Sequence, residues 1–502
     1  MIQIETRLGH ILRILSFSLL AASPGLGLTQ GTTAGNAPRL PLAGTRIVNV
    51  ATEFELQAAM TNLRNGDTLL LTNGVYHLTS SLFVNAHHNV TIRGLDGCTN
   101  VVLAGKGMDN PNFGNTRFGV WSNSTNTTIA HLTIRDTYDN LVIFNPGARS
   151  PRLYCVKLLD AGSQFIKCNP TDVNAGVGVD DGRVEYCWLE YTVGPPGDHG
   201  AGAGYFNGIS AHAAHNWILR GNLFKNLHNP DSAAYLWNPA VLFWRHSANT
   251  TTEQNTFIDV DRAVAYGLES ATTYPDHSGG VIRNNFVWLA PGLMKPSRLA
   301  GSDGSIIAWN SPRTQIDHNT ILLNDNESFA IEFRFSTTTD AAARNNLADK
   351  PIHLRDNATA ALSGNLLGAA AGMFLNPSIG DLHLLPSATA AIDKATPLGS
   401  VTNDFDGDGR PQGSGYDIGA DEFTPNLPLV ITNIVLTGTN LVLSFPTAVG
   451  FEYDIQRADD LASKSWTTIT TNVNGTGGLL QVKDLTSPQR QPERFYRVRL
   501  LP

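Results

Sequence analysis

The chain has few charged residues and no long run of apolar or basic ones. Charged side chains make up 16% of its 502 residues, and the formal net charge is −8. Without a basic stretch, this balance gives no reason to expect a nucleic-acid partner. No stretch approaches eighteen consecutive apolar residues, so we expect no membrane-spanning helix.

Several catalytic signatures are also missing. There is no Gly-rich phosphate loop and no Gly-x-Ser-x-Gly elbow, which argues against nucleotide chemistry and serine hydrolysis. The four cysteines, Cys98, Cys155, Cys168 and Cys187, show no CxxC spacing, so a zinc cluster is not expected. Cys155 and Cys187 fall at nearly matching positions of adjacent repeats. A disulfide between them and buried thiols stacked in the core both fit that placement.

A short phrase recurs through the middle of the chain. Each copy has an Asn, usually with an apolar residue three positions before it and another two positions after it. These residues are Asn222, Asn255, Asn285, Asn319, Asn346 and Asn365, at steps of 33, 30, 34, 27 and 19 residues. Such periods are typical of solenoids, propellers or arrays. Apolar and polar residues alternate within the phrase, and no 3.6-residue pattern lies between copies, so the elements are predicted to be strands.

We therefore predict an all-β fold, a right-handed parallel β-helix with one turn per repeat. Stacked turns lie about 4.8 Å apart, so the recurring Asn would form an internal ladder at a bend, where left-handed backbone angles are tolerated. The residue two before each Asn faces outward and alternates in charge. This stripe indicates structural ion pairs rather than a site; it runs Glu185, Arg220, Glu253, Arg283, Asp317 and Arg344.

The chain divides into four predicted parts. Residues 1–28 carry Arg7, Arg13 and a short apolar core, as in a secretory signal. A linker follows over 29–46, and the β-helix with its cap and closing segment occupies 47–426. Six short alternating strands in 427–502 predict a small fibronectin-like β-sandwich. We expect a secreted or cell-surface monomer.

Two stretches resemble a known family. Thr52 and Glu55 form a capping box before a short helix, and "LQAAM" followed by "NGDTLLLTNGVY" is similar to the entry turn of pectate-lyase-like parallel β-helix proteins. The stretch "DFDGDGRPQGSGYDIGADEF" resembles a closing segment of exported bacterial β-helix proteins. The resemblance implies a helix that caps one open end, where apolar core would otherwise be exposed.

Counting fifteen residues back from the ladder Asn places candidate site residues on one strand face. This count puts His212, Arg245 and Trp309 in a single outward row, with Ile209, Leu242 and Ile306 facing inward. The resemblance implies binding of an acidic polysaccharide and proton removal beside the uronate carboxylate by an Arg, Lys or His base. His212 or Arg245 would be that base, and Arg262, Lys225 or His246 would help neutralise charge.

Glu269, Trp309 and Arg334 are expected to complete the substrate groove, because Arg pairs with carboxylates and aromatic faces stack on sugar rings. Two alternatives stay open. Asp180-Asp181 with His199-Gly200 resembles the Asp pair and His of polygalacturonases, which would give a hydrolase. A non-catalytic carbohydrate-binding or adhesion solenoid would need no base at all.

A metal site is also suggested near the end of the coil. Asp404, Asp406 and Asp408 with Gly409 match the first half of a calcium loop, with oxygen ligands at alternate positions. The twelfth position is Gly415 rather than Glu, so the motif is incomplete. Calcium is the expected ion, against a solvated acidic turn.

Overall fold

The computed structural model describes residues 37–38, 40–42, 44–197, 204–270, 273–423, 431–437, 440–447, 452–460, 465–476, 478–486 and 493–500, with two short N-terminal strands. The chain forms two compact units. One comprises Thr29–His383 with Ala390–Glu422, and the other comprises Met1–Leu28, Leu384–Thr389 and Phe423–Pro502. Neither helix in the described part has the length and apolarity that a bilayer crossing needs.

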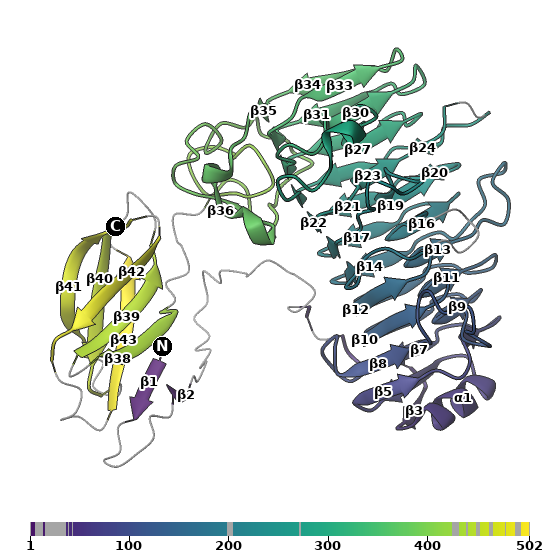
Figure 1. Cartoon of the computed structure of the whole chain (residues 1–502), viewed down its shortest axis with the longest axis horizontal. Coiled ribbons are helices and arrows are strands. Elements are labelled where there is room, and N and C mark those ends of the chain that lie inside the picture. Colours follow the sequence, from purple (N-terminus) through teal and green to yellow (C-terminus); the bar gives the residue numbers. More distant parts are fainter. Residues whose placement is uncertain are drawn as a thin grey trace. The chain divides into compact units, whose positions relative to one another are not determined.

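The larger unit is the expected right-handed parallel β-helix (Figure 1). Its turns stack into three walls of parallel strands around an apolar core. Wall 1 contains β3 (Arg46–Val50), β4 (Asp67–Leu71), β7 (Thr91–Arg93), β10 (Thr128–Thr137), β12 (Arg152–Ala161), β14 (Arg183–Glu185), β17 (Ile218–Arg220), β21 (Thr251–Glu253), β25 (Val281–Arg283), β28 (Gln315–Asp317), β31 (Ala341–Arg344) and β34 (Ala360–Ser363). Wall 2 contains β5 (Gly74–His77), β8 (Val101–Ala104), β15 (Trp188–Glu190), β18 (Leu223–Lys225), β22 (Thr256–Ile258), β26 (Phe286–Trp288), β29 (Thr320–Leu322), β32 (Leu347–Ala348) and β35 (Leu366–Leu367), and the long strands β10 and β12 extend into it.

Wall 3 is a sheet of ten strands. They are β6 (Leu82–Val84), β9 (Val120–Ser122), β11 (Val142–Phe144), β13 (Ile166–Cys168), β16 (Ile209–His212), β19 (Pro239–Trp244), β23 (Arg262–Tyr266), β27 (Gly304–Trp309), β30 (Phe329–Arg334) and β33 (Ile352–Arg355). Small elements lie outside the walls: α2 (Pro296–Leu299), η1 (Ala371–Met373), η2 (Pro377–Ile379), and the two-stranded pairs β20 (Ser247–Ala248) with β24 (His277–Ser278) and β36 (Phe374–Asn376) with β37 (Asp381–Leu384).

The predicted Asn ladder stands at the bend between walls 1 and 2. Each side-chain amide donates to the carbonyl oxygen of the next Asn at 2.8–3.0 Å, from Asn222 through to Asn365. That same oxygen accepts the backbone N–H of the preceding ladder residue, for example Asn255 N to Asn285 Oδ1 at 3.0 Å. The ladder is confirmed, but the left-handed backbone angle belongs to the residue before each Asn, such as Gln254 (φ 57°) or Asn284 (φ 52°).

Those left-handed residues hold the closing segment against the coil. The amide of Gln254 donates to Asp404 O at 2.9 Å, and the amide of Asn284 donates to Asn403 O at 2.7 Å. On the next two turns, His318 Nδ1 lies 3.2 Å from Gly419 O, and the amide of Asn345 donates to Thr396 O at 2.8 Å. Because four successive turns each supply one contact, residues 396–420 lie along the outside of the bend.

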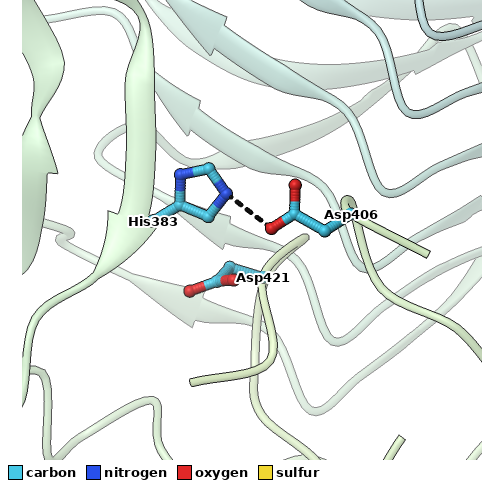
Figure 2. A group of neighbouring side chains, drawn as sticks. All are labelled: His383, Asp406 and Asp421. Carbon is cyan, nitrogen blue, oxygen red and sulfur yellow. Dashed lines mark hydrogen bonds and ion pairs between the residues drawn. The ribbon is translucent and has the colours of Figure 1, made fainter. Parts of the chain in front are cut away.

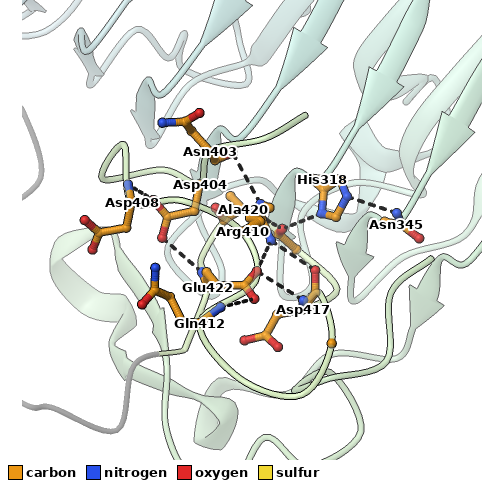
Figure 3. Close-up of polar contacts among 12 residues, drawn as sticks. His318, Asn345, Asn403, Asp404, Asp408, Arg410, Gln412, Asp417, Ala420 and Glu422 are labelled. Atoms are coloured by element: carbon orange, nitrogen blue, oxygen red, sulfur yellow. Dashed lines mark hydrogen bonds and ion pairs between the residues drawn. The ribbon is translucent and has the colours of Figure 1, made fainter. Parts of the chain in front are cut away.

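A buried ion pair fixes the closing segment internally (Figure 3). Arg410 Nη1 donates to Glu422 Oε2 at 2.7 Å, and both side chains are fully buried. Arg410 Nη2 donates to the carbonyls of Gly419 and Ala420 at 2.9 and 2.8 Å. A buried charge is tolerated only when it is paired and hydrogen-bonded, so this network folds the segment into one shape.

The alternating charge stripe is structural, as expected. Glu185, Arg220, Glu253, Arg283, Asp317 and Arg344 pair consecutively between adjacent strands of wall 1. Glu253 accepts from Arg283 at 2.8 Å and also pairs with Arg220, and Arg344 reaches Asp317 at 2.7 Å. Opposite charges on neighbouring strands contribute a few tenths to about 1 kcal/mol each.

The first open end of the coil is capped by α1 (Glu53–Thr61). The capping box is present: Thr52 Oγ1 accepts from Glu55 N, and the Glu55 carboxylate accepts from Thr52 N, both at 3.2 Å. Leu56 is fully buried against the core. Phe54, in the first turn of the helix, is 82% exposed.

Two of the four cysteines form a disulfide and two are free thiols. Cys98 and Cys155, 57 residues apart, form a disulfide that spans the intervening turn of β10. Cys168 and Cys187 are buried thiols, and burial raises the pKa of both. Cys187 faces the core while Cys155 lies outside it, with Tyr154 and Ala130, so Cys155 and Cys187 do not pair.

The smaller unit contains the six predicted antiparallel strands. One sheet holds β38 (Asn433–Thr437), β39 (Asn440–Pro446) and β42 (Leu479–Asp484), and the other holds β40 (Glu452–Ala458), β41 (Thr467–Asn474), β43 (Glu493–Leu500), β1 (Ile2–Glu5) and β2 (Ile14–Leu15). Their inner faces share a core that includes Phe445, Tyr453 and Tyr496. The rest of the expected signal segment, like residues 424–430 beside the expected domain boundary, lies outside the described residues.

Candidate functional site

The outer face of wall 3 carries three of the predicted site residues, His212, Trp309 and Arg334. Successive side chains of a strand alternate between the core and the outside, and paired strands place outward residues side by side. One outward row consists of Lys167, Ser210, Leu242, Ala265, Ile307, Glu332 and His353. The second contains His212, Trp244, Trp309, Arg334 and Arg355, and Gly267 lies between the two tryptophans.

The predicted alignment of His212 with Arg245 is wrong by one residue. Trp244 pairs with His212, and Leu242, expected inside, packs outside with Trp244 and Trp309. Ten residues separate His212 from Asn222 and Trp309 from Asn319, but eleven separate Trp244 from Asn255. The extra residue sits where Arg245 and His246 both take positive φ, 50° and 74°. The prediction assumed the same number of residues between strand and ladder in every turn, so it placed Arg245 where Trp244 lies.

Lys167 and His212 are in direct contact on this surface. Lys167 Nζ lies 3.1 Å from His212 Nε2 and 3.2 Å from Ser210 Oγ. Burial lowers the pKa of Lys167 to about 8, and the charge of Arg245 acts in the same direction. Burial, with the charges of Lys167 and Arg245, lowers the pKa of His212 to about 3. Near neutral pH the imidazole is therefore neutral, and the amine loses its proton near pH 8.

Arg245 lies beside this pair, just beyond the end of β19. Its Nη2 and Nε both donate to Glu269 Oε1, at 2.8 and 3.2 Å, and its guanidinium lies over the Trp244 ring at 4.4 Å. Asp276 accepts the backbone N–H of Arg245 at 2.6 Å and that of Glu269 at 2.8 Å. Asp276 thus positions both partners, and the Arg245 side chain keeps 41% of its surface exposed to a ligand.

A shallow groove of about 520 Å³ continues along the second row. Its lining residues are Leu268, Glu269, Ser270, Trp309, Arg334 and Phe335. Three predicted substrate-binding residues, Glu269, Trp309 and Arg334, therefore share one groove. Trp309 is only 7% exposed, because Arg334 lies over its ring at 4.6 Å. The ring is thus not the open stacking surface that the sequence suggested.

Arg262 has a structural position rather than a catalytic one. Its side chain is 3% exposed, and its Nη2 lies 2.9 Å from Asp303 Oδ2. Its Nη1 donates to Trp237 O at 3.1 Å, and burial lowers its pKa. A guanidinium enclosed in this way joins two loops of the coil; it lies 5.4 Å from the centre of the Trp309 ring but does not itself line the groove.

Lys225 and His246 also differ from expectation. Lys225 belongs to β18 in wall 2 and pairs with Glu190 at 3.2 Å, so it serves a different side of the coil. His246 stacks on Tyr274 at 4.2 Å, and its Nδ1 lies 3.0 Å from Val173 O. As the residue after Arg245, it lies at the margin of the site and fastens two loops there.

The carboxylate pair of the hydrolase alternative occupies turn positions. Asp180 Oδ1 accepts from the backbone N–H of His215 and contacts its Nδ1, both at 3.0 Å. Asp181 has a positive φ of 61° and pairs with Arg149 at 3.0 Å. These contacts explain the two residues as parts of a turn. His199 lies outside the described residues.

The three aspartates of the calcium expectation have different surroundings. Asp404 Oδ1 accepts the backbone N–H groups of Asp406 and Asp408 at 3.0 and 2.8 Å, and its Oδ2 accepts that of Glu422 at 3.1 Å. Burial, with the charges of Asp421 and Asp406, raises its pKa to about 8. Asp404 thus binds its own loop, and Asp406 approaches His383 and Asp421 instead.

The sequence-based choice of base overlooked Lys167. Its signal was nevertheless present: Ile166-Lys167-Cys168 places one cation between two buried residues in a short strand. A lone charge at the outward position of an otherwise apolar strand is a candidate for function. Only strand pairing with β16 shows that it touches His212.

No family model and no curated protein matches the chain. Several solved structures are similar to it. An alginate lyase from Paenibacillus sp. strain FPU-7 is 16% identical over 65% of this chain and 100% of its own, with a TM-score of 0.42. The pectate lyase Pel9A is 13% identical over 76% and 98%, at 0.44. The Streptococcus pneumoniae surface protein and adhesin PfbA is 12% identical over 63% and 92%, at 0.41. At TM-scores below 0.5 these likenesses decide nothing about the chemistry of this chain.

Proposed function

We propose that the protein is an exported polysaccharide lyase that cleaves an acidic, uronate-containing polysaccharide by β-elimination. The observation that carries this proposal is the contact between Lys167 and His212 beside the accessible guanidinium of Arg245. A general base works best with a pKa near the working pH, and the lowered pKa of Lys167 meets that condition.

Each residue has a role in this reaction. Neutral Lys167 removes the proton from the carbon next to the uronate carboxylate. Arg245 pairs with that carboxylate and stabilises the charge that develops on it. The electron pair forms the new carbon–carbon double bond as the glycosidic bond breaks, and the departing oxygen takes a proton from solvent. Neutral His212 then accepts a hydrogen bond from the Lys167 ammonium.

The groove of Glu269, Trp309 and Arg334 extends the site along the coil. Arg334 pairs with Asp356 at 2.6 Å, on the outward side of the second row. A polymer lying across successive turns would meet Lys167 and Arg245 and then Arg334. The Cys98–Cys155 disulfide supports export, because such bonds persist mainly in oxidising compartments.

The test is a screen of pectate, alginate and glycosaminoglycans, read by the ultraviolet absorbance of unsaturated uronate ends. Lys167→Ala should lower the rate by about 10²- to 10⁴-fold, the usual contribution of a general base. Lys157→Ala is the matched control, since Lys157 lies over the Trp188 ring at 4.0 Å and away from wall 3.

Three results would contradict the proposal. Equal activity of Lys167→Ala and wild type would show that Lys167 is not the base. New reducing ends without the absorbance would indicate a hydrolase. Binding to a polysaccharide without any cleavage would indicate the non-catalytic carbohydrate-binding solenoid.

A further inference from the structure

A second cluster of ionisable side chains lies in the closing segment, apart from wall 3. His383 belongs to β37, while Asp406 and Asp421 follow 23 and 38 residues later (Figure 2). One ligand atom from each lies within 4.8 Å of the other two. Three separate stretches of chain therefore bring one imidazole and two carboxylates to a common point.

The imidazole is oriented before any ligand arrives. Its Nδ1 lies 2.5 Å from Asp381 Oδ1, so its Nε2 faces the carboxylates, 2.9 Å from Asp406 Oδ2. A carboxylate behind a histidine is the arrangement that fixes the tautomer and ring orientation of metal-bound histidines. Asp381 thus has the position of an outer partner.

Aromatic packing holds the same ring from a second direction. The rings of Phe286 and Phe405 stack at 3.9 Å, and the His383 imidazole meets them edge-on at 5.1 and 5.7 Å. Phe286 belongs to wall 2 and Phe405 to the closing segment. The imidazole is therefore fixed where the closing segment meets the coil.

We propose that His383, Asp406 and Asp421 bind one first-row divalent cation of the zinc or manganese type, which cross-links three stretches of the closing segment where it packs against Phe286 of the coil. Imidazole nitrogen suits zinc and carboxylate oxygen suits manganese, whereas calcium prefers all-oxygen sites. Bonds of 2.0–2.2 Å around a tetrahedral ion put neighbouring ligand atoms about 3.4 Å apart. The observed separations, from 2.9 Å to at most 4.8 Å, bracket that value, so small side-chain rotations suffice.

The binding test uses the full-length protein, stripped with a chelator and titrated with Zn²⁺ and separately with Mn²⁺ by calorimetry. We expect one equivalent to bind and the melting temperature to rise. His383→Gln and Asp421→Asn should abolish both effects. Asp381→Asn should weaken binding about 10- to 100-fold, the usual effect of an outer partner. His77→Ala, in the exposed part of β5, is the control for adventitious binding by a surface histidine.

Two outcomes would overturn the proposal. Unchanged Zn²⁺ and Mn²⁺ affinity in both His383→Gln and Asp421→Asn would place binding elsewhere. The protein could instead bind Ca²⁺ alone, with binding lost in Asp408→Asn but kept in His383→Gln. That result would support the calcium site predicted from the sequence. None of these readouts depends on polysaccharide cleavage, so failure of the proposed function leaves this test intact.

Discussion

Single residues on wall 3 determine what the surface can do. Lys167, His212 and Arg245 lie close enough for their charges to matter to one another, and partial burial makes the uncharged forms of the first two favourable. Desolvation disfavours the charged form of any buried base. Burial in the coil therefore brings the pKa of this lysine down to about 8.

The rate of β-elimination should follow the ionisation of Lys167. Because the base must be neutral, we expect the rate to rise with pH and to level off above about 8. Initial rates between pH 6 and 10 on the most active polysaccharide of the screen check this. A rate that falls over the same interval would identify a protonated group as the essential one.

The lowered pKa of Lys167 also predicts how stability depends on pH, and this measurement needs no substrate. The folded state holds the Lys167 proton less tightly than the unfolded chain does, since burial lowers the folded pKa from 10.5 to about 8. Below pH 8 the charged lysine therefore destabilises the fold, and this penalty disappears as pH rises through 10.5. Lys167→Gln should melt at a higher temperature than wild type at pH 7, and the difference should vanish near pH 11.

At the scale of elements, the ladder asparagines hold the bend between walls 1 and 2. The Asn285 amide donates to Thr252 O and to Asn319 Oδ1, and its Oδ1 accepts from both the backbone and the side chain of Asn255. All of these groups are buried, so each hydrogen bond replaces one that water cannot supply. The ladder thus stabilises the bend between walls 1 and 2.

Asn285→Ala should lower the free energy of unfolding by about 3 kcal/mol, because it leaves several buried hydrogen-bonding groups without partners, at roughly 1–3 kcal/mol each. Chemical denaturation followed by circular dichroism measures the change. Asn249→Gly is the matched control. Asn249 forms an exposed Asn–Asn bond to Asn216, and glycine accepts its positive φ of 56° without strain. Equal losses in the two variants would mean that the ladder bonds contribute nothing special.

At the scale of the whole molecule, the coil is joined across its turns by one covalent bond. The Cys98–Cys155 disulfide closes a loop of 57 residues. In the chain-entropy model a loop of that length stabilises the folded state by about 4 kcal/mol, since the unfolded chain loses freedom. The first half of the coil should therefore depend on oxidation.

Reduction, or the double substitution Cys98→Ser with Cys155→Ser, should lower the unfolding free energy by about that 4 kcal/mol. Thermal melts with and without reductant measure it. Cys187→Ala should keep the full sensitivity to reductant, because its thiol is a buried core group. Loss of that sensitivity in Cys187→Ala would instead support pairing of Cys155 with Cys187.

Much of the architecture was readable from local patterns. Each copy of the Asn phrase, each position of the charge stripe and each strand of the sandwich can be recognised from a few neighbouring residues. The stripe from Glu185 to Arg344 and the ladder from Asn222 to Asn365 were predicted residue by residue. Alternation within a strand is a local property, so single turns carry the information.

The site was only partly readable, because lateral neighbours depend on the exact number of residues between walls. The sequence by itself determined a coil with an internal Asn ladder, and it brought Glu269, Trp309 and Arg334 into one predicted groove. Tertiary structure alone decided that Trp244 takes the place beside His212, that Lys167 touches His212, and that Arg262 is enclosed. The physical reason is that one extra residue with a left-handed backbone changes the number of residues between a wall 3 strand and the ladder by one, and nothing in the local pattern records that change.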